Sequence, residues 1–221
     1  MASSLIKAVI FDFDGLMLDT ELPSFQVWQE IFAQHGAVLE REIWVQCVGA
    51  SYDHFHPCTH LEKLTGKTVN YKELVDLKNQ LKSDICDKLP FMPGVIEKLD
   101  EVKELSLKMA IASSSSNIWI ERHLDMRKVR DEFDAIATGN EVKQTKPMPD
   151  VYLLAAKKLG LDPKYCLAFE DSRNGVLAAK AAGMTVVAVP NSITEASDFS
   201  KADLKLKSLN EMTIGEILGQ V

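Results

Sequence analysis

The clearest pattern near the N-terminus is a short apolar run that ends in two aspartates. Residues 8–11 are apolar and rich in β-favouring types, and Asp12, Asp14 and Gly15 follow. Side chains two positions apart on an extended strand point the same way, so the pattern predicts a buried strand that presents both carboxylates to one pocket. Two like charges this close are costly unless they share a cation or a proton, which implies a divalent metal.

A helical pattern replaces the strand pattern after Gly15 and continues to about residue 89. Apolar residues recur at helical spacing between Phe25 and Phe32, and Gly36 is in position to end that helix. Further helices are predicted at 40–47, 56–65 and 71–89. Four helices without an intervening strand indicate a small bundle inserted after the first strand.

Strands and helices alternate from Pro93 onward. Strands are predicted at 108–113, 135–138, 166–169 and 185–189, and helices at 94–105, 117–125, 150–159 and 174–182. This alternation predicts an α/β fold with a doubly wound parallel sheet. The predicted domains are a discontinuous α/β core, residues 1–16 and 91–221, and an inserted helical cap, residues 17–90.

Polar residues follow the predicted strands at several points along the chain. They are Asp12 and Asp14, Ser113, Lys146, and the pair Glu170 and Asp171. Ligands of open α/β sheets bind at the carboxyl edge of the strands, so these distant residues are expected to converge on one site.

These residues resemble the four ordered motifs of the haloacid dehalogenase superfamily. The matching segments are Asp12-Phe-Asp14-Gly15, Ser113 after an apolar run, Lys146-Pro-Met-Pro-Asp150, and Glu170-Asp171-Ser-Arg-Asn-Gly. Within the superfamily the chain is similar to the β-phosphoglucomutases and sugar-phosphate phosphatases with a helical cap. Leu16 replaces the usual threonine or valine. The resemblance implies a Mg²⁺-dependent phosphohydrolase whose cap closes over a small phosphorylated metabolite.

The resemblance assigns a catalytic role to four residues. Asp12 is the candidate nucleophile, since a carboxylate can attack phosphorus and form an aspartyl-phosphate. Asp14 is expected to begin protonated and to act as the general acid and base. Ser113 is expected to donate to phosphate oxygens while the serines after it cap the next helix. Lys146 is expected to balance the charge of Asp12 and of the phosphoryl group.

Metal and substrate contacts are also implied. Asp171 is expected to bind Mg²⁺ with Asp12 and the backbone carbonyl of Asp14, and Glu170 to bind it directly or through water. Ser172 and Asn174 are expected to shape the loop and cap the helix after it. The candidate substrate-binding residues are Glu21, Ser24, Gly49, Ala50, Ser51, Tyr52, Ser114 and Asn117.

The composition and charge of the chain argue against nucleic acids and membranes as partners. The chain of 221 residues has a net charge of −7 and no long basic run, which argues against a nucleic-acid partner. No apolar stretch approaches the length of a membrane span, and Asp12 interrupts the N-terminal apolar run. We therefore expect a cytoplasmic protein that acts as a monomer. Its four cysteines form no CxxC pair and are expected to be reduced.

A cluster of histidines and a cysteine offers an alternative metal site. His54, His56, Cys58 and His60 lie close together, but their spacing matches no common zinc pattern and Pro57 interrupts it. We expect these residues to line a cap helix that faces the mouth of the active site, without zinc.

Two alternative functions remain open. A β-phosphoglucomutase-type enzyme would need a cationic anchor for a second phosphate, and Tyr52 and Ser24 stand near the positions where an arginine and a histidine are expected. Net hydrolysis is therefore preferred, although Lys78 or Lys82 could supply a substitute cation. A non-catalytic phosphate-binding or regulatory protein on this fold would not need the complete set of acidic and basic motif residues.

Overall fold

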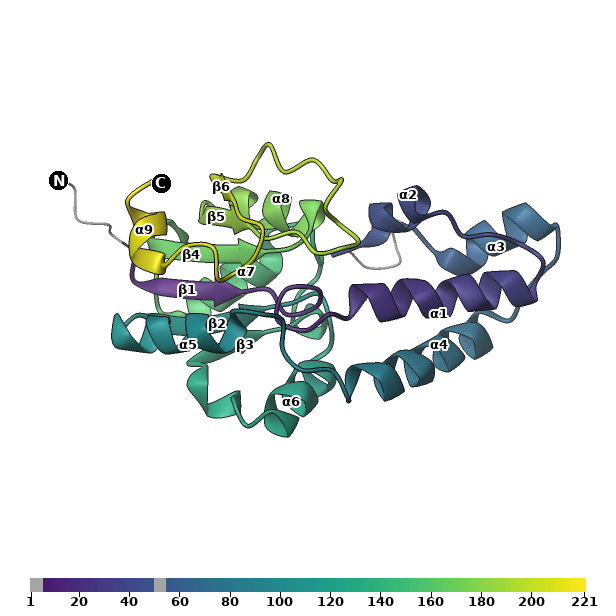
Figure 1. Ribbon diagram of the computed structural model, residues 1–221, viewed down its shortest axis with the longest axis horizontal. Helices are drawn as coiled ribbons and strands as arrows, with labels where there is room; N and C mark the ends of the chain where they lie inside the picture. The colour runs from purple at the N-terminus through teal and green to yellow at the C-terminus, as the bar shows by residue number, and fades with distance from the viewer. Residues whose placement is uncertain (1–5, 50–54) are drawn as a thin grey trace.

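The core of the molecule is a six-stranded parallel sheet. The computed structural model describes residues 6–49 and 55–221. The strand order is β3-β2-β1-β4-β5-β6, and every neighbouring pair is parallel (Figure 1). The strands are β1 (Ala8–Phe11), β2 (Lys108–Ala112), β3 (Ala135–Ala137), β4 (Cys166–Glu170), β5 (Thr185–Ala188) and β6 (Leu204–Lys205). The predicted fold class is confirmed.

Helices cover both faces of the sheet because successive strand residues point to opposite sides. Val9 and Phe11 face the layer formed by α5 (Val95–Glu104), α6 (Asn117–Met126) and α9 (Ile214–Leu218). Ala8 and Ile10 face the layer of α7 (Asp150–Leu159) and α8 (Arg173–Ala181). Buried apolar side chains form both layers, so the sheet is shielded from water on each face.

A helical insertion follows β1 and lies beyond the carboxyl end of the sheet (Figure 1). It contains α1 (Glu21–Gln34), α2 (Arg41–Trp44) with the 3₁₀ turn η1 (Val45–Cys47), α3 (Pro57–Thr65) and α4 (Tyr71–Cys86). The insertion has its own apolar cluster, centred on Trp28, Phe32 and Leu61. None of the helices in the described part of the chain is both long and apolar enough to cross a membrane.

The element boundaries mostly follow local signals. Asn70, Ser116 and Ser172 cap α4, α6 and α8 with their side chains, and Gly160 ends α7 in a left-handed conformation. The sequence prediction missed β6, which has two residues, and α9, although a capping box of Thr213 and Glu216 marks its start. It also missed three short 3₁₀ turns, η2 (Arg130–Glu132), η3 (Gly139–Glu141) and η4 (Pro163–Tyr165).

Arg127 fastens the end of the insertion to the core. Its guanidinium donates to the backbone carbonyls of Cys86, at 2.9 Å, and Leu89, at 2.6 Å, and it lies 5.4 Å from the centre of the Phe91 ring. These carbonyls belong to the last residues before the chain re-enters the core. Helix α4 accordingly ends at Cys86, three residues before its predicted end.

Replacement of Arg127 by methionine should destabilise the protein by about 1.5–3 kcal/mol, since two partly buried carbonyls lose a charged donor. Urea unfolding followed by circular dichroism measures the change. Arg130→Met is the matched control, because within the described residues the Arg130 side chain pairs with Glu121 alone, at 3.6 Å and exposed to solvent. It should change stability by less than about 0.5 kcal/mol. Equal effects of the two variants would contradict the role of Arg127.

Candidate active site

A cavity of about 580 Å³ lies where the helical insertion meets the carboxyl edge of the sheet. The core contributes Asp12, Asp14, Lys146, Trp119, Arg122, Ile118 and Ser113 to Ser116 to its lining. The insertion contributes Glu21, Ser24, Trp44, Val48, Gly49, Lys78, Asn79, Lys82 and Ser83. The catalytic candidates, which are distant in the sequence, therefore converge on one cavity.

Asp12 is held in a buried ionic network at the end of β1. Lys146 donates to Asp12 Oδ1 at 2.5 Å and to Glu170 Oε1 at 2.6 Å, and the Tyr152 hydroxyl donates to the same Glu170 oxygen at 2.5 Å. Burial raises the pKa of Asp12 to about 8, against the opposing effect of Lys146. Burial also disfavours the ammonium of Lys146, but the two carboxylates outweigh it and raise the pKa of Lys146. The network therefore carries more negative than positive groups.

Asp171 completes a cluster of three buried carboxylates. One oxygen from each of Asp12, Glu170 and Asp171 lies within 4.8 Å of the others. Asp171 Oδ2 accepts a hydrogen bond from Asn191 at 2.7 Å, whereas Oδ1 is buried and has no hydrogen-bond partner among the described residues. Burial and the charge of Asp12 raise the pKa of Asp171 well above 3.8. An unpartnered carboxylate oxygen in an all-oxygen donor set fits a hard divalent cation.

Gly15 allows the backbone turn after Asp14 to lie close to the Asp171 carboxylate. Its φ is +85°, and a Cβ atom at this position would lie 2.3 Å from Asp171 Oδ2. The backbone oxygen of Gly15 accepts from Asn191 at 3.1 Å, so the turn after Asp14 is fastened to the same amide that holds Asp171. A side chain at this glycine would displace the carboxylate.

Glu170 differs from Asp171 because hydrogen bonds occupy both of its oxygens. Oε1 accepts from Lys146 and Tyr152, and Oε2 accepts from the Ser172 hydroxyl at 3.1 Å. Ser172 also caps α8 through Gly175, as predicted. Glu170 is thus the buried anchor of Lys146.

Asp14 faces the other side of the cavity and has a separate set of partners. Trp119 Nε1 donates to Oδ1 at 2.9 Å, and Lys82 of α4 lies 3.6 Å from the same oxygen. Ser115 donates to Oδ2 at 2.7 Å. Burial by itself would raise the pKa of Asp14, but Lys82 and the Ser115 hydrogen bond hold it below its ordinary value. These partners favour the carboxylate form of Asp14, and the expectation that it begins the reaction protonated stays a prediction.

The serine run after β2 divides its hydrogen bonds between the site and the next helix. Ser113 Oγ lies 3.3 Å from Asp14 Oδ2, and Ser114 donates to the carbonyl of Gly49 at 3.1 Å. Ser116 caps α6, as predicted. The prediction that Ser115 would also act as a cap is wrong, because its hydroxyl binds Asp14.

The predicted substrate-binding residues divide into three groups. Glu21, Ser24, Gly49 and Ser114 line the cavity, and burial raises the pKa of Glu21 to about 7. Asn117, the first residue of α6, borders a separate surface hollow and not the cavity. Its backbone N–H donates to Asn140 Oδ1. Ala50, Ser51 and Tyr52 lie outside the described residues.

The described members of the histidine and cysteine cluster, His56, Cys58 and His60, do not line the cavity. His56 caps α3 and stacks on Tyr71, Cys58 is buried, and His60 packs against Phe32. The expectation that these residues line the active-site mouth is wrong, because α3 lies at the far end of the insertion from the core (Figure 1). His54 lies outside the described residues.

Sequence reasoning missed several residues that hold the site. Asn191 follows β5 at the same edge of the sheet, so its position was a usable signal. Asn174 was assigned to the loop and helix cap, but its side chain donates to the carbonyl of Val48 at 2.9 Å. Tyr152 and Trp119 gave no signal, since aromatic residues at helical spacing usually indicate a core.

Comparisons with known proteins agree with this geometry. The chain is 44% identical over 214 residues to a protein named "Putative phosphatase YhcW" of Bacillus subtilis, covering 97% of each chain. It is 34% identical over 218 residues to hexitol phosphatase B of Escherichia coli K12, again covering 97% of each. The crystal structure of β-phosphoglucomutase from Clostridium difficile superposes with a TM-score of 0.82 at 25% identity, covering 97% of this chain and 96% of that chain.

A model of one protein family also matches most of the chain. It is described as haloacid dehalogenase-like hydrolase, and it matches residues 9–189, a range that contains all four of the motifs identified in the sequence. The protein therefore belongs to the haloacid dehalogenase-like hydrolase family.

Proposed function

We propose that this protein is a Mg²⁺-dependent phosphatase that hydrolyses a small sugar or polyol phosphate through an aspartyl-phosphate on Asp12. The observation that carries the proposal is the buried arrangement of Asp12, Lys146 and Asp171 beneath a cavity whose opposite side presents Asp14. Residues 1–16 and 91–221 act as the catalytic core, and residues 17–90 act as the cap.

Asp12 and Asp14 divide the chemistry in this mechanism. A carboxylate oxygen of Asp12 bonds to phosphorus while the P–O ester bond breaks, and protonated Asp14 gives its proton to the departing oxygen. Water then attacks the phosphoenzyme, its proton passes to Asp14, and phosphate leaves Asp12 free. Lys146 offsets negative charge on the transferring group.

The three carboxylates suggest how Mg²⁺ would be held. Asp12 and Asp171 would bind it with the backbone carbonyl of Asp14, and Glu170, whose oxygens already accept hydrogen bonds, would act indirectly. When bound, Mg²⁺ would neutralise charge on the phosphoryl oxygens and favour the ionised form of Asp12.

Asp14 must gain a proton before it can act as an acid. Lys82 holds the pKa of Asp14 below its ordinary value in this structure. A bound phosphoryl group would place negative charge beside Asp14 and would raise this pKa while Lys82 stays in place. Substrate binding and protonation of the acid are coupled in this proposal.

The cavity lining supports a hydroxyl-rich substrate. Its volume of about 580 Å³ lies within the usual range for small-molecule sites, and the insertion presents Glu21, Ser24 and Asn79 to it. Carboxylate, hydroxyl and amide groups pair well with sugar hydroxyls. The relative named hexitol phosphatase B makes a hexitol phosphate a suitable first substrate for a test.

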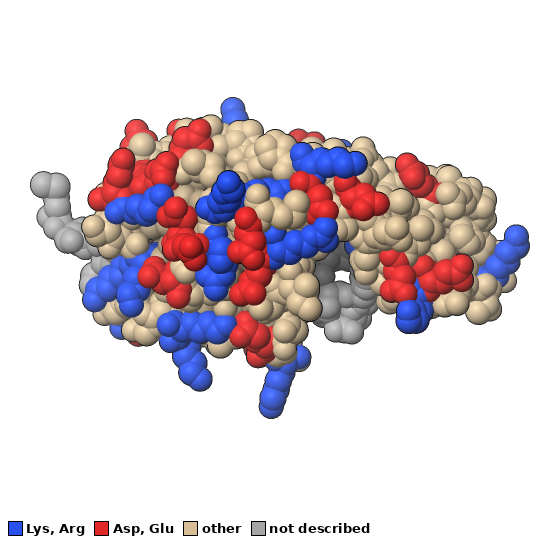
Figure 2. Space-filling view, turned by 90° about the horizontal axis from the view of Figure 1, so that it is seen from below, with Lys and Arg blue, Asp and Glu red and all other residues tan. Residues whose placement is uncertain are grey.

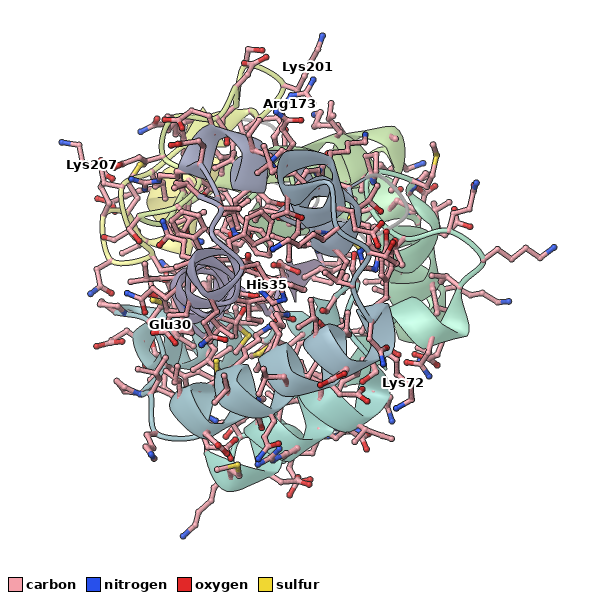
Figure 3. The ribbon with its side chains drawn as sticks, turned by 90° about the vertical axis from the view of Figure 1, so that its right-hand side faces the viewer. Glu30, His35, Lys72, Arg173, Lys201 and Lys207 are labelled. Atoms are coloured by element: carbon pink, nitrogen blue, oxygen red, sulfur yellow. The ribbon has the colours of Figure 1, made fainter. Side chains whose placement is uncertain are left out.

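Surface charge supports a small metabolite over a nucleic acid. Figure 2 shows basic and acidic side chains mixed across the face seen from below, without a broad basic area. In the view onto the end of the insertion, Lys201 and Lys207 extend away from the body of the molecule (Figure 3). Three other lysines line the cavity and place their positive charge there: Lys78, Lys82 and Lys146.

Asp12→Asn should reduce turnover of 4-nitrophenyl phosphate by at least about three orders of magnitude, because the variant lacks the nucleophile. Steady-state release of 4-nitrophenol measures the loss. Asp19→Asn is the matched control on the same loop, since asparagine can still accept from the Leu22 N–H, and it should stay within about threefold of wild type. A tenth of the wild-type rate in Asp12→Asn would exclude Asp12 as the nucleophile.

Mg²⁺ should stabilise the folded protein, and more strongly at higher pH. The pKa of Asp12 is raised from 3.8 to about 8, so the folded chain binds a proton that the unfolded chain has lost, and metal-free stability falls as the pH rises through this interval. At about 100 times its Kd, Mg²⁺ should add about 2.7 kcal/mol and raise Tm by about 5–10 °C.

Differential scanning calorimetry with Mg²⁺ or EDTA tests this expectation at about pH 6 and about pH 8. Asp171→Asn should abolish most of the Mg²⁺ effect, because it removes charge from the unpartnered carboxylate. A wild-type Tm that is insensitive to Mg²⁺ at both pH values would rule out the proposed metal site.

Incubation with β-glucose 1-phosphate and catalytic β-glucose 1,6-bisphosphate should release free phosphate. A mutase must release a bisphosphate intermediate and rebind it in the reversed orientation without losing the enzyme's phosphoryl group to water. This requires a cationic group that binds the second phosphate strongly. Chromatographic product analysis decides between the activities. Rapid formation of glucose 6-phosphate with little free phosphate would establish the mutase alternative.

A further inference from the structure

We propose that Trp119 is a positioning residue for Asp14: its indole N–H, supported by Lys82, fixes the carboxylate for proton transfer to the leaving group. The inference rests on the proposed function, because it concerns the acid that protonates the departing oxygen. It assigns a task to a tryptophan that belongs to none of the motifs.

The two oxygens of Asp14 are held from different sides. Trp119 Nε1 donates to Oδ1 at 2.9 Å, and Ser115 Oγ donates to Oδ2 at 2.7 Å. Lys82 also lies 3.6 Å from Oδ1 and Ser113 Oγ lies 3.3 Å from Oδ2. Donors on both oxygens fix rotation of the carboxylate plane, which a single hydrogen bond would leave free. Proton transfer needs this plane to be aimed at the reacting oxygen, so loss of either donor should slow the step that uses the proton.

The Trp119 ring is itself clamped. The ring of His123, fully buried one turn further along α6, meets it edge-on at 4.2 Å between ring centres with an interplanar angle of 75°. The ammonium of Lys82 lies 4.7 Å from the ring centre. A ring held by an aromatic neighbour and a cation has little freedom to rotate, so its N–H stays directed at Asp14.

The clamp joins the core to the helical insertion. Trp119 belongs to α6, whereas Lys82 belongs to α4. Arg122 of α6 ties the same helices together by donating to Ser83 at 2.8 Å and pairing with Asp87. The orientation of Asp14 therefore depends on α4 remaining packed against α6, so the acid is fully positioned when the insertion is closed on the core.

This role has a kinetic consequence that depends on the leaving group. The parameter kcat/KM reports events up to cleavage of the substrate P–O bond when that step is irreversible. 4-Nitrophenolate departs without a proton, whereas the more basic phenolate gains from protonation by Asp14. A defect in the position of the acid should therefore affect phenyl phosphate more than 4-nitrophenyl phosphate, while a general loss of binding should affect both equally.

The test compares Trp119→Phe with wild type on these two probe substrates. Phenylalanine keeps an aromatic ring between His123 and Lys82 but has no N–H. The variant should lose about tenfold more kcat/KM with phenyl phosphate than with 4-nitrophenyl phosphate. Lys82→Met, which keeps the length of the side chain, should give a smaller loss with the same leaving-group dependence.

Arg122→Gln tests the dependence on helix packing. It weakens the contact between α4 and α6, so it should give a smaller loss of kcat/KM with the same greater effect on phenyl phosphate. Arg130→Gln is the control, because Arg130 pairs with Glu121 away from this contact, and it should leave kcat/KM within about threefold of wild type for both substrates. Circular dichroism and Tm establish that each variant is folded. Equal losses for the two substrates in Trp119→Phe and Lys82→Met, or no loss in either, would overturn the positioning role.

Asp14→Asn separates this inference from the proposed function. If Asp14→Asn shows a strong leaving-group dependence and the tryptophan and lysine variants do not, Asp14 is the acid and Trp119 does not position it. If Asp14→Asn itself treats both substrates alike, the acid role fails, and the inference about Trp119 fails with it.

Discussion

The structure depends on the burial of three carboxylates around one lysine. Asp12, Glu170 and Asp171 are each at most 4% exposed. Lys146 forms ion pairs with Asp12 and Glu170. Burial, followed by the repulsion of the neighbouring carboxylates, raises the pKa values of Asp12 and Asp171, because one positive group does not balance three negative ones. The cluster is thus built to take up a cation or a proton, and a fold would not retain this cost without a use for it.

The sheet is the means by which this cluster forms. Parallel strands end at one edge, so an apolar run followed by carboxylates could be recognised in the sequence as a strand that delivers them to a shared site. Asp12, Ser113 and Asp171 lie at this edge, as predicted from the strand pattern together with the motif resemblance. Asn191 holds Asp171 from the same edge of the sheet and could have been recognised by its position after β5, whereas Tyr152 holds Glu170 from helix α7, where no local pattern distinguishes it from a core residue.

Asp14 illustrates what a motif cannot specify. Its position follows from its spacing to Asp12, and the predicted location is correct. Its charge state depends on Lys82, which reaches it from a helix in the insertion, and on Trp119 and Ser115, which follow a different strand. The pKa of a carboxyl group depends on its assembled environment, so the motif alone did not indicate that these partners lower the pKa of Asp14.

The engagement of Lys82 also bears on the choice between hydrolysis and mutase chemistry. Lys82 lies between Asp14 and the Trp119 ring, so a second phosphate that recruited it would remove a charge partner from Asp14 and a cation from the ring. A hydroxyl-rich leaving group needs no such exchange, because Ser24, Glu21 and Asn79 line the cavity with hydrogen-bonding groups. Lys82 is therefore directed at the acid and not at a distal anion, which favours release of the dephosphorylated product.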